Sequence, residues 1–350
     1  MIYKLTKIKI TKLISISCLL FLFSTFAYAQ TTKSEKIENE ESKPSSQKKE
    51  FSFQIEPKIS IQTGTIGEYV YQKNNSSWEK LSYLEWEEKN IYPFGLTIFA
   101  DYKNFSTSFY VGSTFKSRCG NMYDSDWIDF KGFKTTYSIN ENSLDKYFVV
   151  NFSIKYAFQP FKQLKVSPIA QFEYSSIKFN ARNGYGWYGN EASPKVSWDN
   201  ENAVYKPKGT LYGVDYERRT TAILLGFALD YTLNKRIHFG ASYLISPYTY
   251  LFNVDSHFKD HAQKTGTEYV DVIDCFFKNM KAEISVYYDF TENLSLGISA
   301  QGNFILLSLG KNYSRLIGNS NYNYHSTTQG GASASTFEIS FGCKYNFLQF

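Results

Sequence analysis

The sequence predicts an all-β protein, a ten-stranded antiparallel transmembrane β-barrel. Three observations support this prediction. Apolar and polar residues alternate with a period of two in many segments after residue 50, which gives a strand one apolar and one polar face. Aromatic residues make up 18% of the chain, and outer-membrane barrels carry aromatic girdles at both membrane interfaces. The first residues also have the features of an export signal.

The first 29 residues are expected to be a signal peptide. Lysines precede an apolar run from Leu13 to Phe26, and residues 27–29 read Ala-Tyr-Ala, which fits a cleavage site. The run is shorter than the roughly 20 apolar residues of a membrane-spanning helix. A lipoprotein signal ending at Cys18 is the alternative, but Ser15 stands where such signals carry Leu.

Residues 30–50 are polar and charged, and are expected to form a flexible periplasmic segment ahead of a barrel at 51–350. The signal contains four of the 38 basic residues and none of the 33 acidic ones, so the rest of the chain is nearly neutral. A nucleic-acid partner would need a basic surplus, and is not expected. Three cysteines remain after the signal, an odd number that argues against a disulfide framework.

The alternation is regular in several segments, taken here in chain order. Odd positions are apolar and even positions polar throughout 51–62. Even positions are apolar in 148–158 and again in 280–290, and odd positions are apolar in 337–347. Ten strands are expected, at about 51–72, 79–101, 105–118, 146–159, 164–181, 210–232, 236–252, 268–290, 294–309 and 336–347.

The connections between these segments alternate in length. Short turns are expected at 101–104, 159–162, 233–235 and 291–293, and longer segments at 73–78, 119–145, 182–209, 253–267 and 310–335. Short turns belong to the periplasmic side and long loops to the outside. Backbone groups inside a bilayer must all be paired, so the strands are expected to close into a barrel.

Two short motifs lie near the long connections. Asp124 and Asp126 are two residues apart, a spacing that points both carboxylates to one face of an extended strand. Asp255 and His257 repeat this spacing with a carboxylate and an imidazole. A neutral imidazole accepts a proton from water, and an adjacent carboxylate orients it. Together the four residues predict a site that activates water, with a polar loop cap as the alternative for the two aspartates.

Strict alternation raises a difficulty for the second motif. Ile237, Phe239 and Tyr243 are expected to face lipid, and the same parity puts Asp255 and His257 on the lipid face. A bulge or bend near Pro247 would shift the register and turn both side chains inward.

Several segments resemble the omptin family of outer-membrane endopeptidases, over residues from about 59 to 347. The matching segments are Glu68-Tyr69-Val70-Tyr71, Ser117-Arg118-Cys119-Gly120-Asn121-Met122, Asp124-Ser125-Asp126-Trp127, Phe179-Asn180-Ala181-Arg182, Asp255-Ser256-His257 and Lys344-Tyr345-Asn346-Phe347. Their order along the chain makes the joint match far more specific than any one tetrapeptide.

The resemblance implies an aspartic-type endopeptidase that cuts next to basic residues. It assigns a water held between Asp124 and His257, supported by Asp126 and Asp255, with no covalent intermediate and no cofactor or essential metal. It also implies that Glu68 binds the basic side chain on the acyl side of the cut, because a buried carboxylate pairs with a cation. A solvated charge at a strand end is the alternative for Glu68.

Two positions depart from the family pattern. A second acidic group two positions before D-x-H is replaced by Asn253, so preference for basic residues is either relaxed or rebuilt from elsewhere. The places at which known members bind lipopolysaccharide hold Phe172, Tyr174 and Ser176. Strong dependence on that lipid is therefore not expected, although another outer-membrane lipid could serve.

Other interpretations stay open at this point. Cys119 lies close to Asp124 and could be a nucleophile, but no histidine is near it in sequence and a structural role is favoured. His257 and His261 could help to bind a divalent ion, although no recognised zinc motif is present. A non-catalytic adhesin or porin is the alternative function. We expect a monomer in the outer membrane, with peptide substrates reaching the site from outside the cell.

Overall fold

The computed structural model describes residues 51–128, 132–260 and 262–349. All of them belong to the compact unit Lys49–Phe350. The predicted signal peptide and periplasmic segment lie outside the described residues. Within the described residues no helix has the length and apolar character needed to cross a membrane.

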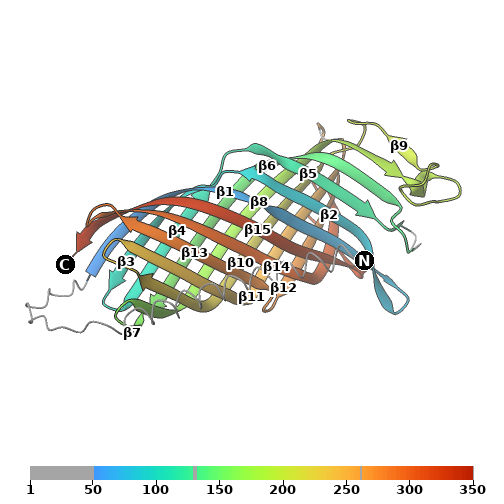
Figure 1. The fold of residues 1–350 in the computed structure, drawn as a ribbon. Helices are drawn as coiled ribbons and strands as arrows, with labels where there is room; N and C mark the ends of the chain where they lie inside the picture. Colours follow the sequence, from blue (N-terminus) through green and yellow to red (C-terminus); the bar gives the residue numbers. More distant parts are fainter. Residues whose placement is uncertain (1–50, 129–131, 261, 350) are drawn as a thin grey trace, which may run out of the picture. The chain divides into compact units, whose positions relative to one another are not determined.

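Most described residues lie in antiparallel strands (Figure 1). The strands are β1 (Phe51–Asn74), β2 (Ser77–Ile91), β3 (Phe94–Tyr102), β4 (Phe105–Ser113), β5 (Ser117–Asp126), β6 (Thr136–Tyr156), β7 (Phe158–Phe161), β8 (Leu164–Tyr188), β9 (Val204–Lys206), β10 (Val214–Thr232), β11 (Ile237–Asp260), β12 (Thr265–Cys275), β13 (Asn279–Asp289), β14 (Leu294–Leu316) and β15 (Asn323–Gln349). A 3₁₀ turn, η2, covers Gly189–Glu191.

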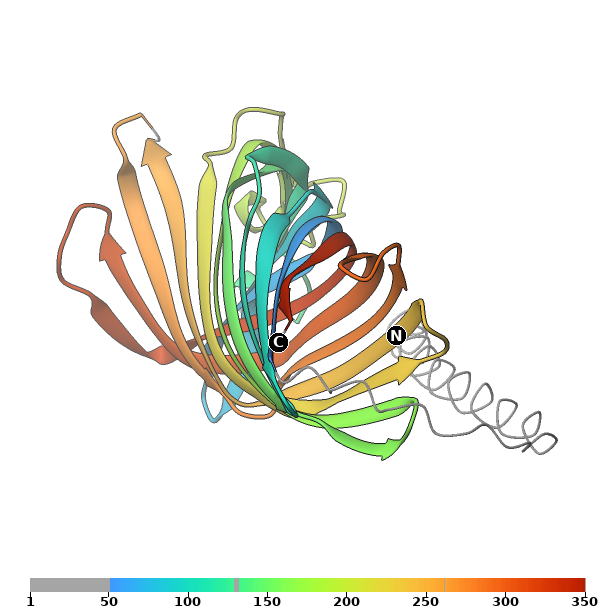
Figure 2. The ribbon, with the colours of Figure 1, turned by 90° about the vertical axis from the view of Figure 1, so that its left-hand side faces the viewer.

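The strands close into a ring. β1 pairs with β15 along one edge and with β3 and then β2 along the other. The pairs β2 with β3, β4 with β5, and β12 with β13 each act as one interrupted strand, and within the described residues the short β7 and β9 pair only with β8 and are not part of the ring. The ring therefore has the ten strands expected from the sequence. The strands run tilted around a common axis (Figures 1 and 2). The prediction of a ten-stranded antiparallel barrel is confirmed.

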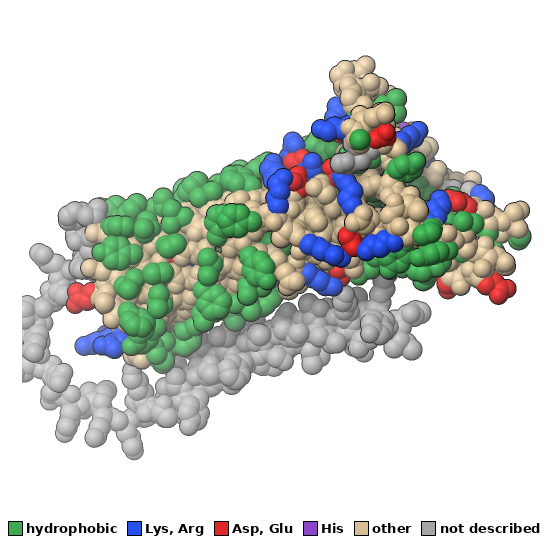
Figure 3. Space-filling view, turned by 90° about the horizontal axis from the view of Figure 1, so that it is seen from above, with side chains coloured by type: hydrophobic (Ala, Val, Ile, Leu, Met, Phe, Trp, Pro, Cys, Tyr) green, Lys and Arg blue, Asp and Glu red, His purple; other side chains and the backbone are tan. Residues whose placement is uncertain are grey.

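On the face shown in Figure 3, hydrophobic side chains cover much of one end of the outer wall. On β1 the side chains of Ile59 and Ile61 are exposed, while those of Ser60 and Gln62 are buried inside. Other exposed apolar residues continue this belt around the ring: Leu96, Phe109, Phe152, Ile154, Ile223, Phe227, Phe239, Tyr243, Ile284, Ile298, Ile339 and Phe341. An outward apolar band is the surface that a barrel presents to hydrocarbon.

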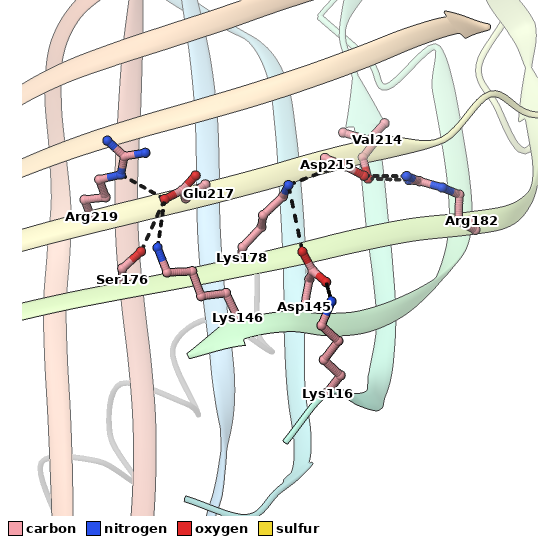
Figure 4. Close-up of polar contacts among 10 residues, drawn as sticks. All are labelled: Lys116, Asp145, Lys146, Ser176, Lys178, Arg182, Val214, Asp215, Glu217 and Arg219. Atoms are coloured by element: carbon pink, nitrogen blue, oxygen red, sulfur yellow. Dashed lines mark hydrogen bonds and ion pairs between the residues drawn. The ribbon is translucent and has the colours of Figure 1, made fainter. Parts of the chain in front are cut away.

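Beyond this belt the outer wall becomes charged. The carboxylates of Asp145 on β6 and of Asp215 and Glu217 on β10 are each flanked by lysine or arginine side chains (Figure 4). Arg182 Nη2 lies 2.5 Å from Asp215 Oδ1, and Arg219 Nε lies 2.8 Å from Glu217 Oε1. Charged side chains are costly in hydrocarbon, so this band marks where the barrel leaves it. The wall above the band is outside the membrane-spanning part.

Buried rings fill the lumen above the level of the apolar belt. The rings of Trp86, Phe179 and Tyr216 are fully buried and stack with centroid distances of 5.7 and 5.3 Å. Below them a cavity of about 360 Å³ is lined by polar and charged side chains, among them Glu173 and Lys281, which contact each other. A lumen packed in this way does not provide the open channel that a porin needs.

The long connections are shorter than the sequence indicated. Residues 119–145 were expected to form a loop, but β5 continues to Asp126 and β6 begins at Thr136. Likewise β11 continues through the second motif to Asp260. Above the membrane both faces of a strand tolerate polar residues, so alternation disappears although the backbone ladder continues. The residues of both motifs therefore lie on strands.

Candidate active site

Asp124 and Asp126 lie side by side on the inner face of β5. Their Cα partners are Leu84 and Ser82 on β2. Met122, one step below on the same face, is fully buried beneath them. The i and i+2 spacing thus places both carboxylates toward the lumen, as expected, and on a floor of buried apolar side chains.

A bulge in β11 turns the second motif inward. Ile245 pairs with Leu225 but Tyr248 pairs with Ile223, so β11 holds one residue more than β10 at Ser246-Pro247. The register shift expected near Pro247 is confirmed. Above the bulge Asp255 pairs with the fully buried Tyr216 and shares its inner face.

The two motifs meet across the lumen. β5 and β11 are not neighbours in the ring, yet Asp124 and Asp126 both interact electrostatically with His257. His257 Nε2 lies 2.5 Å from Asp255 Oδ2. The His257 side chain is 42% exposed while that of Asp255 is 6% exposed. The imidazole is therefore accessible from the open end and anchored by a buried carboxylate.

The carboxylates control the protonation of this cluster, which lies above the apolar belt. Burial alone would lower the pKa of His257, but Asp255, Asp124 and Asp126 raise it to about 9. Burial and then Asp126 raise the pKa of Asp124 well above its usual range. Such couplings mean that the cluster retains a proton that isolated carboxylates would lose.

Glu68 lies on the inner face of β1 and is 3% exposed. Burial, Asp255 and Asp271 raise its pKa well above the usual range. Its Oε2 has no hydrogen-bond partner among the described residues. The interpretation of Glu68 as a solvated charge is wrong, because the ring of strands encloses it.

Sequence reasoning missed two residues of this region. Arg218 is 3% exposed on β10, and Asp271 is 4% exposed on β12. Asp271 is the Cα partner of Asn253, so it lies next to the position where the family pattern expects a carboxylate. The only signal in the sequence was a lone carboxylate, Asp271, among the apolar residues Val270, Val272 and Ile273. Its partner could not be found from the sequence, because cross-strand partners depend on strand register.

The environments of Cys119 and of the histidines bear on the cysteine and metal alternatives. Cys119 is fully buried among apolar side chains, and burial raises the pKa of its thiol to about 12, so a structural role fits. Among residues 51–128, 132–260 and 262–349 no group of three His, Cys, Asp or Glu side chains is arranged to hold a metal ion. His261 lies outside the described residues.

Comparison with known proteins identifies the family to which the chain belongs. The profile of the Omptin family matches residues 48–347. The chain belongs to the Omptin family. This membership makes it an outer-membrane protease with peptide substrates. The fold agrees with that of the outer membrane protease OmpT from Escherichia coli, at a TM-score of 0.74 and 20% identity over 85% of this chain and 97% of that chain.

Two other solved structures resemble this omptin only weakly. The translocator domain of the autotransporter NalP from Neisseria meningitidis has a TM-score of 0.35 at 7% identity, over 83% of this chain and 88% of that chain. The toluene transporter TodX from P. putida has a TM-score of 0.29 at 11% identity, over 85% and 90%. No match was found among curated protein sequences.

Proposed function

We propose that this omptin is an endopeptidase that hydrolyses peptide bonds next to basic residues by means of a water held between Asp124 and His257. The observation that carries the proposal is the meeting of the two motifs across the lumen, from strands that are not neighbours. If the aspartates and the histidine of the two motifs had only a structural role, the two motifs would not need to face each other across the lumen.

Each residue has a separate role in the proposed mechanism. The Asp255 carboxylate accepts a hydrogen bond from His257 Nε2, so the other ring nitrogen, Nδ1, is left to act as the base. Nδ1 accepts a proton from the water while the water oxygen attacks the peptide carbonyl carbon. Asp124 holds a proton that hydrogen-bonds to the developing oxyanion, and Asp126 supports this protonation by its charge. The imidazolium then gives its proton to the leaving amine, so the cycle closes without a covalent intermediate.

The substrate reaches the site from the extracellular side. Asp255 and His257 lie on β11 at the level of Asp215 in the charged outer band, and the site faces the end opposite the short turns, which outer-membrane barrels place in the periplasm. A basic side chain on the acyl side of the cut binds Glu68, because a buried carboxylate gains most from a cationic partner.

Cleavage of a fluorogenic peptide with Arg-Arg at the scissile bond tests the mechanism. Asp124→Ala and His257→Ala should each lower kcat/KM by about 10³-fold or more, because general-base catalysis and oxyanion stabilisation each contribute on the order of 10²–10⁴-fold. The refolded barrels should keep their far-ultraviolet circular dichroism.

His238→Ala is the matched control. His238 Nε2 lies 2.7 Å from Asp289 Oδ2, so it forms a second Asp–His pair, but near the short turns. Its loss should leave turnover unchanged. Retained activity in either Asp124→Ala or His257→Ala would reject the mechanism.

A further inference from the structure

Three buried carboxylates lie near one another on the inner wall, and one of them, Asp271, is the Cα partner of Asn253. Glu68, Asp255 and Asp271 are 3%, 4% and 4% exposed. Both aspartates interact electrostatically with Glu68. Asp255 is engaged by His257, but Glu68 and Asp271 form no ion pair with any side chain in the described part of the chain.

The cation nearest to these carboxylates is already held by neutral groups. Arg218 Nε donates to Asn253 Oδ1 at 3.1 Å, and its Nη1 donates to the carbonyl oxygen of Ser333 at 2.8 Å. Its Nη2 donates to the carbonyl oxygen of Gly67 at 2.9 Å. A carboxylate at position 253 would therefore pair with Arg218 and be unavailable to a substrate. Asn253 binds Arg218 through its neutral amide oxygen, so no carboxylate is needed as the partner of Arg218 at this position.

Asp271 is held in position from the other side. It is the Cα partner of Asn253, and Asn312 Nδ2 donates to its Oδ1 at 2.8 Å. Thr328 in turn donates to Asn312 Oδ1 at 2.9 Å. A Cβ atom at Gly330 would overlap the Asp271 carboxylate, so the glycine provides the space that this side chain occupies. One oxygen of the Asp271 carboxylate, Oδ1, is thus fixed by a hydrogen bond from Asn312.

We propose that Asp271 is the second carboxylate of the pocket that binds the substrate's basic side chain, together with Glu68. The acidic group absent from position 253 is thus supplied by the neighbouring strand. This inference rests on the proposed function. A guanidinium group between the two carboxylates would donate to Glu68 Oε2, which is buried and has no hydrogen-bond partner among the described residues.

Paired peptides with arginine or citrulline before the scissile bond test the inference, because citrulline keeps the shape of arginine and removes its charge. Asp271→Asn should raise KM and lower kcat/KM for the arginine peptide by about tenfold to hundredfold, the effect of losing a charged hydrogen-bond partner. The citrulline peptide should change by less than about threefold. Asp271→Glu, which keeps the charge, should preserve most of the arginine preference.

Asp274→Asn is the matched control, since Asp274 lies on the same strand but is exposed and accepts a hydrogen bond from Tyr248. It should leave both peptides unaffected. An Asp271→Asn barrel that folds and keeps the wild-type ratio of arginine to citrulline cleavage would overturn the inference. If Asp271→Asn does not refold, Asp271→Ser is measured in its place with the same expectation.

Equilibrium binding separates this inference from the proposed function. If the wild-type protein cleaves neither peptide, the proposed function fails. Fluorescence anisotropy of the labelled arginine peptide then tests whether Asp271 helps to bind the arginine side chain. Binding that is at least tenfold weaker in Asp271→Asn than in wild type supports the pocket. Equal binding by the two proteins, or no binding by wild type, overturns it.

Discussion

At the scale of single residues, the most informative group is His257. A histidine that must accept a proton works only in its neutral form, yet three carboxylates raise its pKa to about 9. The same carboxylates that place and orient the imidazole thus keep it protonated at neutral pH. We therefore expect the base form to become dominant only in alkaline solution.

This expectation gives a pH prediction. A raised pKa means that activity is low below the pKa and increases as pH rises through about 9. In Asp255→Asn the strongest cause of the rise is removed, so the ascending limb of kcat/KM against pH should move to lower pH, while the maximum rate falls about tenfold or more because the ring is no longer oriented. The pH profiles of both proteins with the arginine peptide provide the measurement. An ascending limb that stays in place would contradict the assignment of His257 as the base.

At the scale of secondary-structure elements, the bulge at Ser246-Pro247 decides which way β11 presents its residues. Side chains alternate along a strand, so one extra residue moves every later side chain to the other face. Below the bulge Phe239 and Tyr243 remain exposed on the outer wall. Above it Asp255 turns to the lumen. A local irregularity therefore lets one strand serve both the apolar belt and the site.

Deletion of Pro247 tests this role. Without the extra residue, the upper part of β11 should flip, because a flip of the lower part would move Phe239 and Tyr243 from the outer wall into the lumen. Peptide cleavage should fall by about 10³-fold or more, as expected for loss of general-base catalysis. Deletion of the exposed Asn319, in the connection between β14 and β15, serves as the control and should preserve activity. A Pro247 deletion that keeps activity would show that the bulge does not set the register.

At the scale of the whole molecule, ring closure produces the site. The candidate residues come from β1, β5, β11 and β12, and only a closed ring brings β5 and β11 to face each other across the lumen. The rings of Trp86, Phe179 and Tyr216 close the floor beneath them. A lumen filled by these rings favours a surface enzyme over a channel.

The chemistry of the whole site predicts independence from divalent ions. Water activation is assigned to His257 and proton storage to Asp124, so no step needs a Lewis acid. Cleavage of the Arg-Arg peptide should be unchanged in excess EDTA. A loss of activity that a divalent ion restores would instead favour the metal-binding interpretation of His257 and the nearby carboxylates.

The sequence by itself determined the all-β class, the number of strands and the spacing of the two motifs. These properties follow from period-two alternation and from the fixed direction of side chains on a strand. It also indicated that β11 needs an irregularity near Pro247, because parity along one strand can be counted without knowing its neighbours.

Only the tertiary structure decided where the strands end, that Glu68 is buried, and that Asp271 lies beside Asn253 near Arg218. Each of these depends on register between strands that are far apart in the chain, and register is set by cross-strand pairing and ring closure. Above the membrane polar residues occupy both faces of a strand, so the pattern that marks strands in the apolar belt is lost there. For this reason the part of the chain that holds the candidate site was the part whose geometry the sequence determined least.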